Sequence, residues 1–433
     1  MKKLLIKNGR VIDPANQIDN TLDVLIENDK IAQIDKKITD NKADIIDATR
    51  LIVTPGFIDM HVHLREPGRE DKETIKTGSW AAAAGGFTSV ACMPNTNPVN
   101  DNESVTEFIL NQAKKEAVVN VFPIAAVTKS SQGEELSEIG GLKQAGAVAL
   151  SDDGLPVSNS RIMRRVLEYS KMFNLVIINH CEDLNLANEG VMHEGYYSTF
   201  LGLRGIPAAS EEVMVARDLI LTDLTGGNYH IAHLSTKGAL ELFMQAKKKK
   251  LNVTAEVTPH HFTLTDENLT TYDTNYKMKP PLRSKEDVKA LIKGIKDGYI
   301  DVIATDHAPH LYDEKNVEFD YAPFGIIGLE TAVPLILDKL FFKAKIDLNR
   351  IISMLTVNPA RILRIERGTL SIGAKADITI LNLNKIHTTN ADQFLSKSKN
   401  TPFNGMKLKG SVEMTLVNGK LVWNAKERKL TAK

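Results

Sequence analysis

The feature that most constrains the fold of this 433-residue chain is a regular alternation of short apolar segments and longer amphipathic ones. The apolar segments are residues 57–63, 88–94, 119–127, 147–153, 175–181, 229–235, 252–260 and 301–307, and helix-like segments between them include 104–115, 159–173, 210–221, 236–249 and 284–297. Eight strands that alternate with helices over roughly 310 residues are typical of an α/β protein with a (β/α)8 TIM barrel. A doubly wound open sheet is the structural alternative, but no GxGxxG motif follows the first strand.

Both ends of the chain are rich in strand-like segments, whereas the middle is not. These segments are residues 4–12 and 22–34 at the N-terminus and 376–383 and 411–423 at the C-terminus. Asn-Gly and Asn-Asp pairs within them indicate tight turns between short strands. We therefore predict a small β-sandwich domain built from both termini, residues 1–53 and 368–433, beside a barrel of residues 54–367.

The composition excludes several classes of protein. Lys plus Arg and Asp plus Glu both number 54, so the formal net charge is zero and neither a nucleic-acid nor an anionic-membrane partner is expected. Apolar residues make up 42% of the chain and charged residues 25%, as in ordinary globular proteins. Cys92 and Cys181 lie far apart and form no CxxC motif, which argues against a disulfide scaffold. Since no targeting or membrane segment is visible, we expect a cytoplasmic protein.

Polar residues stand where the predicted strands end, which is where barrels carry their catalytic groups. His61 and His63 lie two apart on the first strand and so point to the same face. Imidazoles and carboxylates that meet at one mouth predict a divalent-metal site, with zinc as the default ion. A single strand histidine is more often structural, and Asp152 or Asp153 alone could begin the turn at Gly154. His193, His230 and His387 lack this register and are expected to be structural or surface residues.

The number of candidate ligands predicts two metal ions, because four His and two Asp exceed one tetrahedral catalytic site. Asp153 follows the fourth strand, between the ligands of the first and fifth, and is the natural bridge between two ions. Such a site activates water for attack on an amide carbonyl, and Asp306 is placed to accept and return the proton as the catalytic residue. The predicted metal ligands are His61, His63, Asp153, His180, His233 and Asp306.

Three motifs make the chain resemble a known family. Residues 58–68 (IDMHVHLREPG), 93–96 (MPNT) and 304–310 (ATDHAPH) closely resemble the signatures of dihydroorotases. Residues 54–59 (TPGFID) are similar to the barrel entry of the wider amidohydrolase superfamily. The pattern is similar to the bacterial class I type, in which an aspartate replaces the carboxylated lysine that bridges the metals in hydantoinases. Residues 150–153 (LSDD) contain no lysine, in agreement.

The resemblance implies a zinc-dependent enzyme with two Zn²⁺ sites bridged by Asp153. It would reversibly cyclise N-carbamoyl-L-aspartate to (S)-dihydroorotate in de novo pyrimidine (UMP) biosynthesis. The planar fork of Arg65 suits the substrate carboxylate, although a surface ion pair with Glu66 or Glu70 is the alternative. Residues 311–322 are either a lid or a plain surface loop. The substrate-binding residues implied are His63, Leu64, Arg65, Asn95, His310, Phe324 and Gly325.

One departure from the family pattern keeps other functions open. Residues 279–283 read KPPLR, where the family commonly has Asn at the first position and that Asn touches substrate. Lys279 either reaches the ring carbonyl or the carboxylate, or points away. The alternative functions are another cyclic amidohydrolase (allantoinase or dihydropyrimidinase/hydantoinase) and a non-catalytic dihydroorotase-like scaffold of aspartate transcarbamoylase. Expected partners are the small-molecule substrate and either a second copy in a homodimer or aspartate transcarbamoylase.

Overall fold

The computed structural model describes residues 3–430, and a closed barrel of parallel strands forms its centre. In sheet order the strands are β6 (Phe57–Val62), β7 (Phe87–Cys92), β8 (Asn120–Ala125), β9 (Ala149–Leu150), β10 (Val176–Asn179), β13 (Tyr229–Ile231), β14 (Val253–Val257) and β15 (Val302–Ile303). The first and last strands meet through a parallel bridge between Val62 and His307, and the His63 N–H donates to the His307 carbonyl over 2.9 Å. The predicted (β/α)8 barrel is therefore confirmed.

Helices surround the barrel, and every predicted helix is present. They are α1 (Ile75–Ala84), α2 (Glu103–Glu116), α3 (Ile139–Ala145), α4 (Ser160–Ser170), α5 (Leu184–Ala187), α6 (Tyr196–Leu201), α7 (Ala209–Thr225), α8 (Lys237–Lys248), α9 (Lys285–Lys296), α10 (Tyr312–Lys315), α11 (Leu329–Ile336), α12 (Leu348–Leu355) and α13 (Val357–Leu363). Local chemistry fixes their starts, because Asn102, Thr236 and Ser284 accept backbone N–H bonds at the N-caps of α2, α8 and α9. Within residues 3–430, no helix has the length and apolar character needed to cross a membrane.

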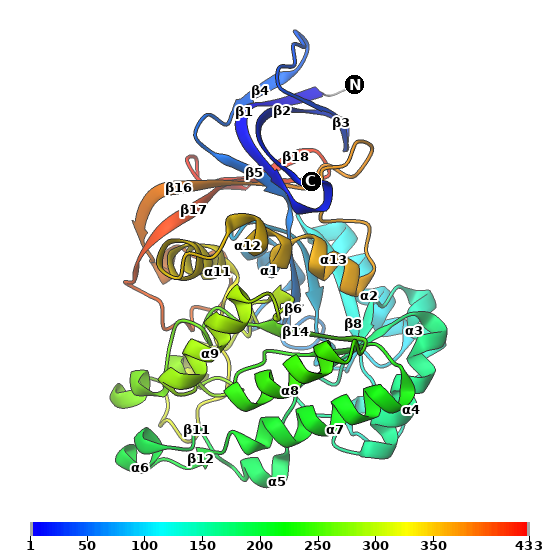
Figure 1. Ribbon diagram of the computed structural model, residues 1–433, viewed down its shortest axis with the longest axis vertical. Coiled ribbons are helices and arrows are strands. Elements are labelled where there is room, and N and C mark those ends of the chain that lie inside the picture. Colours follow the sequence, from blue (N-terminus) through cyan, green and yellow to red (C-terminus); the bar gives the residue numbers. More distant parts are fainter. Residues whose placement is uncertain (1–2, 431–433) are drawn as a thin grey trace.

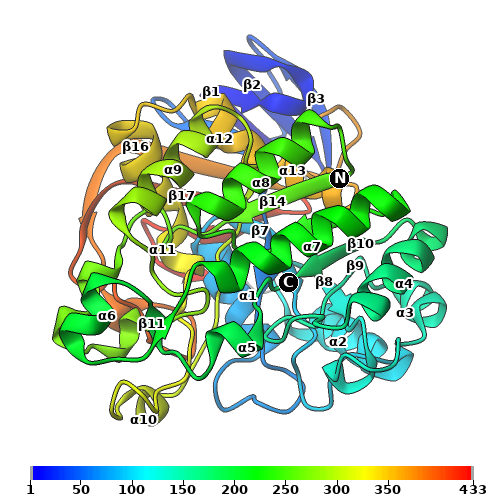
Figure 2. The same ribbon diagram turned by 60° about the horizontal axis from the view of Figure 1, so that its bottom comes forward.

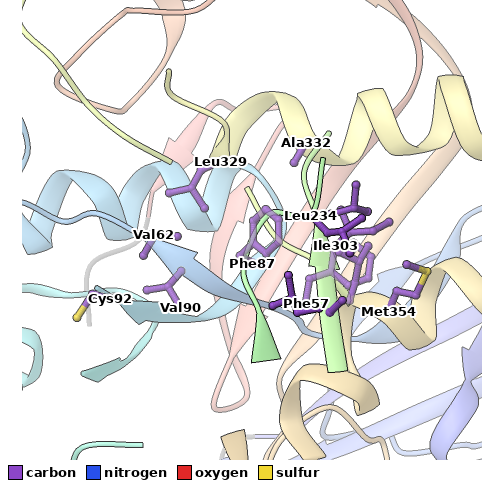
Figure 3. Packing of buried hydrophobic residues seen from close by; sticks show 14 of the residues in the cluster. Phe57, Val62, Phe87, Val90, Cys92, Leu234, Ile303, Leu329, Ala332 and Met354 are labelled. Carbon is purple, nitrogen blue, oxygen red and sulfur yellow. The ribbon is translucent and has the colours of Figure 1, made fainter. Parts of the chain in front are cut away.

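The main core lies between the barrel strands and the helices (Figure 3). Phe57 on β6 and Phe87 on β7 are fully buried and meet edge to face, with ring centroids 6.3 Å apart. Leu329 of α11 and Met354 of α12 pack into the same cluster. Burial of such side chains stabilises the fold by about 1.5–3 kcal/mol each, so this cluster holds the barrel wall in place.

The two termini build a nine-stranded sheet, which lies at the top of Figure 1. In order its strands are β19 (Lys429–Leu430), β18 (Lys420–Asn424), β17 (Lys407–Val417), β16 (Ile378–Thr388), β5 (Ile52–Pro55), β1 (Lys3–Asp13), β2 (Ile18–Glu27) and β3 (Lys30–Asp35), with β4 (Asp44–Asp47) paired to β1. The termini join where β16 pairs antiparallel with β5, Ile380 lying opposite Val53. The expected composite β part is thus one hydrogen-bonded sheet that encloses its own apolar cluster, including Val24 and Ile378.

The terminal sheet meets the barrel at several places, and two of them bear on the site. Gly56 joins β5 to β6, and a side chain there would collide with the hydroxyl of Thr88. Further along the chain, residues 389–406 leave the sheet between β16 and β17 and run back to the mouth of the barrel. There the Asn400 side chain donates to the carbonyls of Ala308 and Gly325 over 3.0 and 3.1 Å. The C-terminal part therefore contributes directly to the region around the strand ends. A further two-stranded sheet pairs β11 (Met192–His193) with β12 (Gly205–Ile206).

Candidate metal and substrate site

The polar residues at the strand ends meet at one mouth of the barrel. His61 lies on β6, and His63 follows it directly; the other four lie just after β9, β10, β13 and β15. The side chains are buried, with exposed fractions of 0% for His61, 4% for His63, 4% for Asp153, 4% for His180, 2% for His233 and 7% for Asp306. Barrel topology thus brings together all six residues that the sequence predicts as metal ligands.

The two carboxylate oxygens of Asp153 face different pairs of imidazoles. Its Oδ2 lies 3.4 Å from Nε2 of His61 and 3.5 Å from Nε2 of His63. Its Oδ1 lies 3.7 Å from Nε2 of His233 and 4.0 Å from Nδ1 of His180. Asp306 completes the first group, with Oδ1 at 3.1 Å from Nε2 of His63. A carboxylate that faces two separate ligand groups has the arrangement expected of a bridge between two cations.

Several buried polar atoms of this cluster have no hydrogen-bond partner among the described residues. They include Nε2 of His61, Oδ1 of Asp153 and Nδ1 of His233. Burial opposes charge on the His61 ring, yet the neighbouring Asp153 and Glu256 raise its pKa well above the ordinary value. Unpartnered buried polar atoms are costly, and a cation removes that cost while it displaces the protons. The donor set of imidazoles and carboxylates therefore fits a divalent metal ion.

Two residues outside the ligand set fix the orientation of the imidazoles. Glu256 on β14 accepts a hydrogen bond from Nδ1 of His61 over 2.6 Å, and its other oxygen lies 3.2 Å from Nε2 of His230. Asn95 accepts from Nδ1 of His63 over 2.8 Å. Such partners set the tautomer of a ligating histidine and raise its basicity. Glu256 is not among the residues predicted from the sequence, although a carboxylate inside the apolar strand 252–260 is a usable signal.

A cavity of about 370 Å³ opens above the cluster. Its lining includes the predicted ligands His63, Asp153, His180, His233 and Asp306, together with Arg65, Asn95, Lys279, His310, Phe324 and Gly325. Leu64 does not line it, because its side chain is buried in the apolar core and packs against Gly78 of α1. Apart from Leu64, the predicted substrate-binding residues share one cavity with the candidate metal ligands.

Arg65 stands in this cavity without a carboxylate partner. Within residues 3–430 it forms no ion pair; Glu66 instead accepts from the N–H of Ile75, and Glu70 accepts from the N–H of Gly68. The alternative of a surface ion pair with Glu66 or Glu70 is therefore wrong. Burial lowers the pKa of Arg65 to about 10, so the guanidinium stays charged at neutral pH. A cation with unused donors inside a cavity is suited to an anionic ligand.

His310 already has protein partners at both ring nitrogens. Nε2 donates to the carbonyl of Phe324 over 2.8 Å, and Nδ1 lies 3.3 Å from Nζ of Lys72. Burial, together with the cations Arg65 and Lys72, lowers the pKa of His310 to about 3, so the ring is neutral. Gly325 lies against the same ring, since a Cβ atom there would come within 3.1 Å of Nε2. The ring and the Phe324–Gly325 backbone thus form one continuous surface.

Lys279, the residue that departs from the family pattern, does not point away from the cavity. Its Nζ lies 2.8 Å from a carboxylate oxygen of Glu182 and 4.9 Å from the centroid of the Phe324 ring. Glu182 also lies near His180, at 3.8 Å from Nε2. The lysine therefore adds a second cation to the cavity wall, on the same wall as Phe324.

A closed (β/α)8 barrel with histidines and aspartates gathered at its strand ends is the architecture of the amidohydrolases. In agreement, residues 49–239 match the model of a family described as dihydro-orotase-like, and residues 328–423 match an amidohydrolase family. The chain is 53% identical to a dihydroorotase of Acetivibrio thermocellus, over 97% of this chain and 98% of the relative. It is 54% identical to a dihydroorotase of Solibacter usitatus, over 99% and 100% of the two chains. The chain therefore belongs to the dihydroorotase family and is an enzyme that acts on cyclic amides.

Solved structures of other amidohydrolases have the same fold. L-hydantoinase from Arthrobacter aurescens superimposes with a TM-score of 0.91 at 24% identity, over 100% of this chain and 98% of that one. Dihydropyrimidinase from Brevibacillus agri gives a TM-score of 0.86 at 23% identity, over the whole of both chains. At this level of identity the likeness concerns the fold alone, and the far higher identity to dihydroorotases determines the family.

Proposed function

We propose that this chain interconverts (S)-dihydroorotate and N-carbamoyl-L-aspartate in pyrimidine (UMP) biosynthesis. The observation that carries the proposal is the combination, in one cavity, of an Asp153 that faces two imidazole pairs and an Arg65 without a carboxylate partner. The arrangement around Asp153 suits metal-assisted hydrolysis of an amide, and the free guanidinium of Arg65 suits a substrate that carries a carboxylate. Identity of 53% to dihydroorotases over 97% of the chain supports the same reaction.

We further propose that the cluster holds two zinc ions bridged by Asp153. His61, His63 and Asp306 would bind one ion, and His180 and His233 the other. Imidazole and carboxylate donors suit zinc. Three groups of three side chains in the cluster lie close enough to hold an ion, and His61, Asp153 and His233 each belong to two of these groups. When bound, these ions supply Lewis acidity toward water and toward the ring carbonyl.

The residues of the chain would then bind the substrate and move one proton. Arg65 holds the carboxylate, and the backbone at Phe324 and Gly325 contacts the ring. Burial opposes ionisation of Asp306, but His61 and His63 hold its pKa below the ordinary value, so it begins as a carboxylate. It accepts a proton from the attacking water and returns it to the ring nitrogen as the amide C–N bond breaks. Cyclisation runs the same steps in reverse and releases water.

The assay that tests this proposal measures dihydroorotate hydrolysis by the purified protein with and without a chelator. We expect activity with zinc, loss of activity with the chelator, and recovery when zinc returns. Turnover of hydantoin or allantoin without turnover of dihydroorotate would indicate another cyclic amidohydrolase. A protein that binds no zinc and stays inactive after zinc addition would support the scaffold of aspartate transcarbamoylase. Association with that enzyme, or a homodimer, remains a prediction that the mass in solution can test.

The proton step has its own test in Asp306→Asn. The amide cannot accept the proton, so kcat should fall by about 10²–10⁴-fold, the usual contribution of a general acid–base. Asp152→Asn is the matched control, because Asp152 is a buried aspartate at the same end of the barrel whose carboxylate binds Thr128 instead. An Asp306→Asn variant with full activity would exclude the proposed role.

A further inference from the structure

One wall of the substrate cavity belongs to residues 308–326, a long segment after β15 that we call the excursion. The excursion is closed at its base, where His307 bridges Ile326 and the N–H of Ala308 donates to the Ile326 carbonyl over 2.8 Å. It includes α10, which Figure 2 shows at the edge of the molecule opposite the terminal sheet. Its outer side chains Tyr312 and Tyr321 are largely exposed, as in a segment that could open. Whether the excursion opens depends on the contacts that hold the part of it that faces the cavity.

Lys315, the last residue of α10, turns its side chain into the excursion. The residue is 5% exposed, and its Nζ donates to the carbonyls of Pro323, Gly325 and Lys277 over 2.9, 3.1 and 3.3 Å. The three donors of an ammonium group are thus matched by three backbone acceptors. Two of these acceptors flank Phe324, the residue whose ring and backbone line the cavity.

No carboxylate among the described residues contacts the Lys315 ammonium group, although the charge of Asp273 acts on it from a distance. Within residues 3–430, Lys315 takes part in no ion pair, and burial lowers its pKa to about 7. Burying an ammonium group without a paired carboxylate is unfavourable unless hydrogen bonds replace those it makes with water, and here the three backbone carbonyls supply them. Of the two carbonyls that flank Phe324, that of Gly325 also accepts from the Asn400 side chain over 3.1 Å. Among the described residues, the Pro323 carbonyl has Lys315 as its hydrogen-bond donor.

A second buried lysine fixes the outer part of the same excursion. Lys277 follows the short helix η5 (Thr274–Tyr276) and is 2% exposed. Its Nζ donates to the carbonyls of Phe319 and Asp320 over 2.7 and 3.0 Å and lies 4.7 Å from the centroid of the Phe324 ring. Its own carbonyl accepts from the N–H of Gly325 over 3.0 Å. The inner and outer parts of the excursion are therefore fastened to one another.

We propose that Lys315 is a positioning residue that fixes the Phe324–Gly325 backbone at the substrate cavity, so that residues 311–325 form a rigid wall and not a lid. The proposal rests on the proposed function only where it concerns substrate binding, since the rigidity of the wall is a property of the free protein. It also predicts which kinetic constant depends on Lys315. A displaced wall weakens substrate binding, whereas the residues that transfer the proton keep their places.

Hydrogen exchange of the wild-type enzyme tests the rigid wall without any substitution. The hydrogen-bonded amides of residues 311–325 should exchange slowly in the free enzyme, and added dihydroorotate should change their rates by less than about twofold. These are the N–H groups of Lys315, Asn316, Tyr321, Ala322 and Gly325. A lid would instead exchange rapidly when free and gain at least tenfold protection on ligand binding, which would overturn the proposal.

The variant Lys315→Met removes the ammonium group but keeps the length of the side chain. We expect exchange of residues 318–325 to accelerate at least tenfold, KM for dihydroorotate to rise at least tenfold, and kcat to change less than threefold. Lys171→Met is the control, because Nζ of Lys171 also donates to a backbone carbonyl, that of Thr225 at the end of α7, and contacts neither the wall nor residues 389–406. If Lys315→Met does not fold, Lys315→Gln is measured with the same expectations.

The outcomes separate this proposal from the proposed function. A wild-type enzyme without dihydroorotate turnover would contradict the proposed function, while the exchange measurements would still decide the rigidity of the wall. Unchanged exchange and unchanged KM in a folded Lys315 variant would overturn the positioning role. Equal losses in kcat and in the amount of folded protein, with unchanged KM, would show that Lys315 serves stability alone.

Discussion

Replacing Glu256 tests how far a bound metal ion depends on the charge behind His61. Glu256→Gln can keep all three contacts of the side chain, to Nδ1 of His61, to the N–H of His233 and to Nε2 of His230, because the amide has one acceptor and one donor group. The variant therefore removes the charge and little else. Glu256→Ala removes the charge and the contacts together.

The structure sets the size of the expected effects. A hydrogen bond to a charged group contributes about 1.5–3 kcal/mol, and a neutral one about 0.5–1.5 kcal/mol. Loss of the charge should thus cost about 1–1.5 kcal/mol, which is roughly a tenfold loss of metal affinity. Glu256→Ala should lose about 100-fold, at the upper end of the effects known for partners of ligating histidines.

The assay is competition for zinc between each variant and a chelator of known affinity at fixed pH. Glu211→Gln is the control, because Glu211 is also a buried glutamate but accepts from the N–H groups of Ser235 and Thr236 and does not contact the cluster. Equal zinc affinity in the wild type and both Glu256 variants would refute the reasoning. An equal loss in the Glu211→Gln control would show that general stability, not the orientation of His61, is being measured.

Three further predictions concern the cavity and the stability of the fold. Arg65→Lys should raise KM for dihydroorotate by about 10–100-fold, because lysine lacks the planar fork that pairs with a carboxylate. Steady-state kinetics measure this change, and an unchanged KM would exclude the contact. Lys279→Met should raise KM for the doubly charged N-carbamoyl-L-aspartate about threefold more than for dihydroorotate, since a partly exposed cation contributes up to about 1 kcal/mol. Equal changes in the two KM values would exclude a contact of Lys279 with the second carboxylate. Burial and the nearby Arg283 lower the pKa of His193 to about 4. Between pH 6.5 and pH 4 the unfolded chain therefore binds more protons than the folded protein, so the free energy of unfolding falls as the pH falls through that window. His193→Gln should flatten this pH dependence, measured by urea unfolding. An unchanged slope would exclude His193 as its source.

The sequence predicts the order and type of the barrel elements well because periodicity is a local property. The predicted strand 229–235 ends at residue 231, however, and 301–307 ends at residue 303. His233 and Asp306 have φ angles of +33° and +50°, left-handed conformations that a strand cannot contain. Such backbone turns aim both side chains into the mouth and are typical of functional sites, but nothing in the residue types announces them.

Contacts between remote segments account for what the sequence analysis did not find. Glu256 was detectable as a charge within an apolar strand, but its partner His61 lies 195 positions away. Asn400 has no local signal at all, since it contacts Ala308 across 92 positions from a part of the chain assigned to the terminal sheet. Lys315 reads as an ordinary surface residue of a polar loop, and only the fold reveals the carbonyl groups around it. These residues depend on tertiary geometry, which periodicity does not encode.

Because residues 389–406 return to the barrel mouth, the metal ligands and the contacts of the substrate wall are completed at different times during synthesis of the chain. Every candidate metal ligand has been synthesised once Asp306 has emerged, but the carbonyls of Ala308 and Gly325 obtain the side-chain donor of Asn400 only after almost 100 more residues. The N-terminal strand β5 likewise waits for β16 before its edge is paired. A nascent chain halted before residue 400 would therefore carry a complete set of metal ligands beside a substrate wall that has its lysine contacts but lacks those of Asn400.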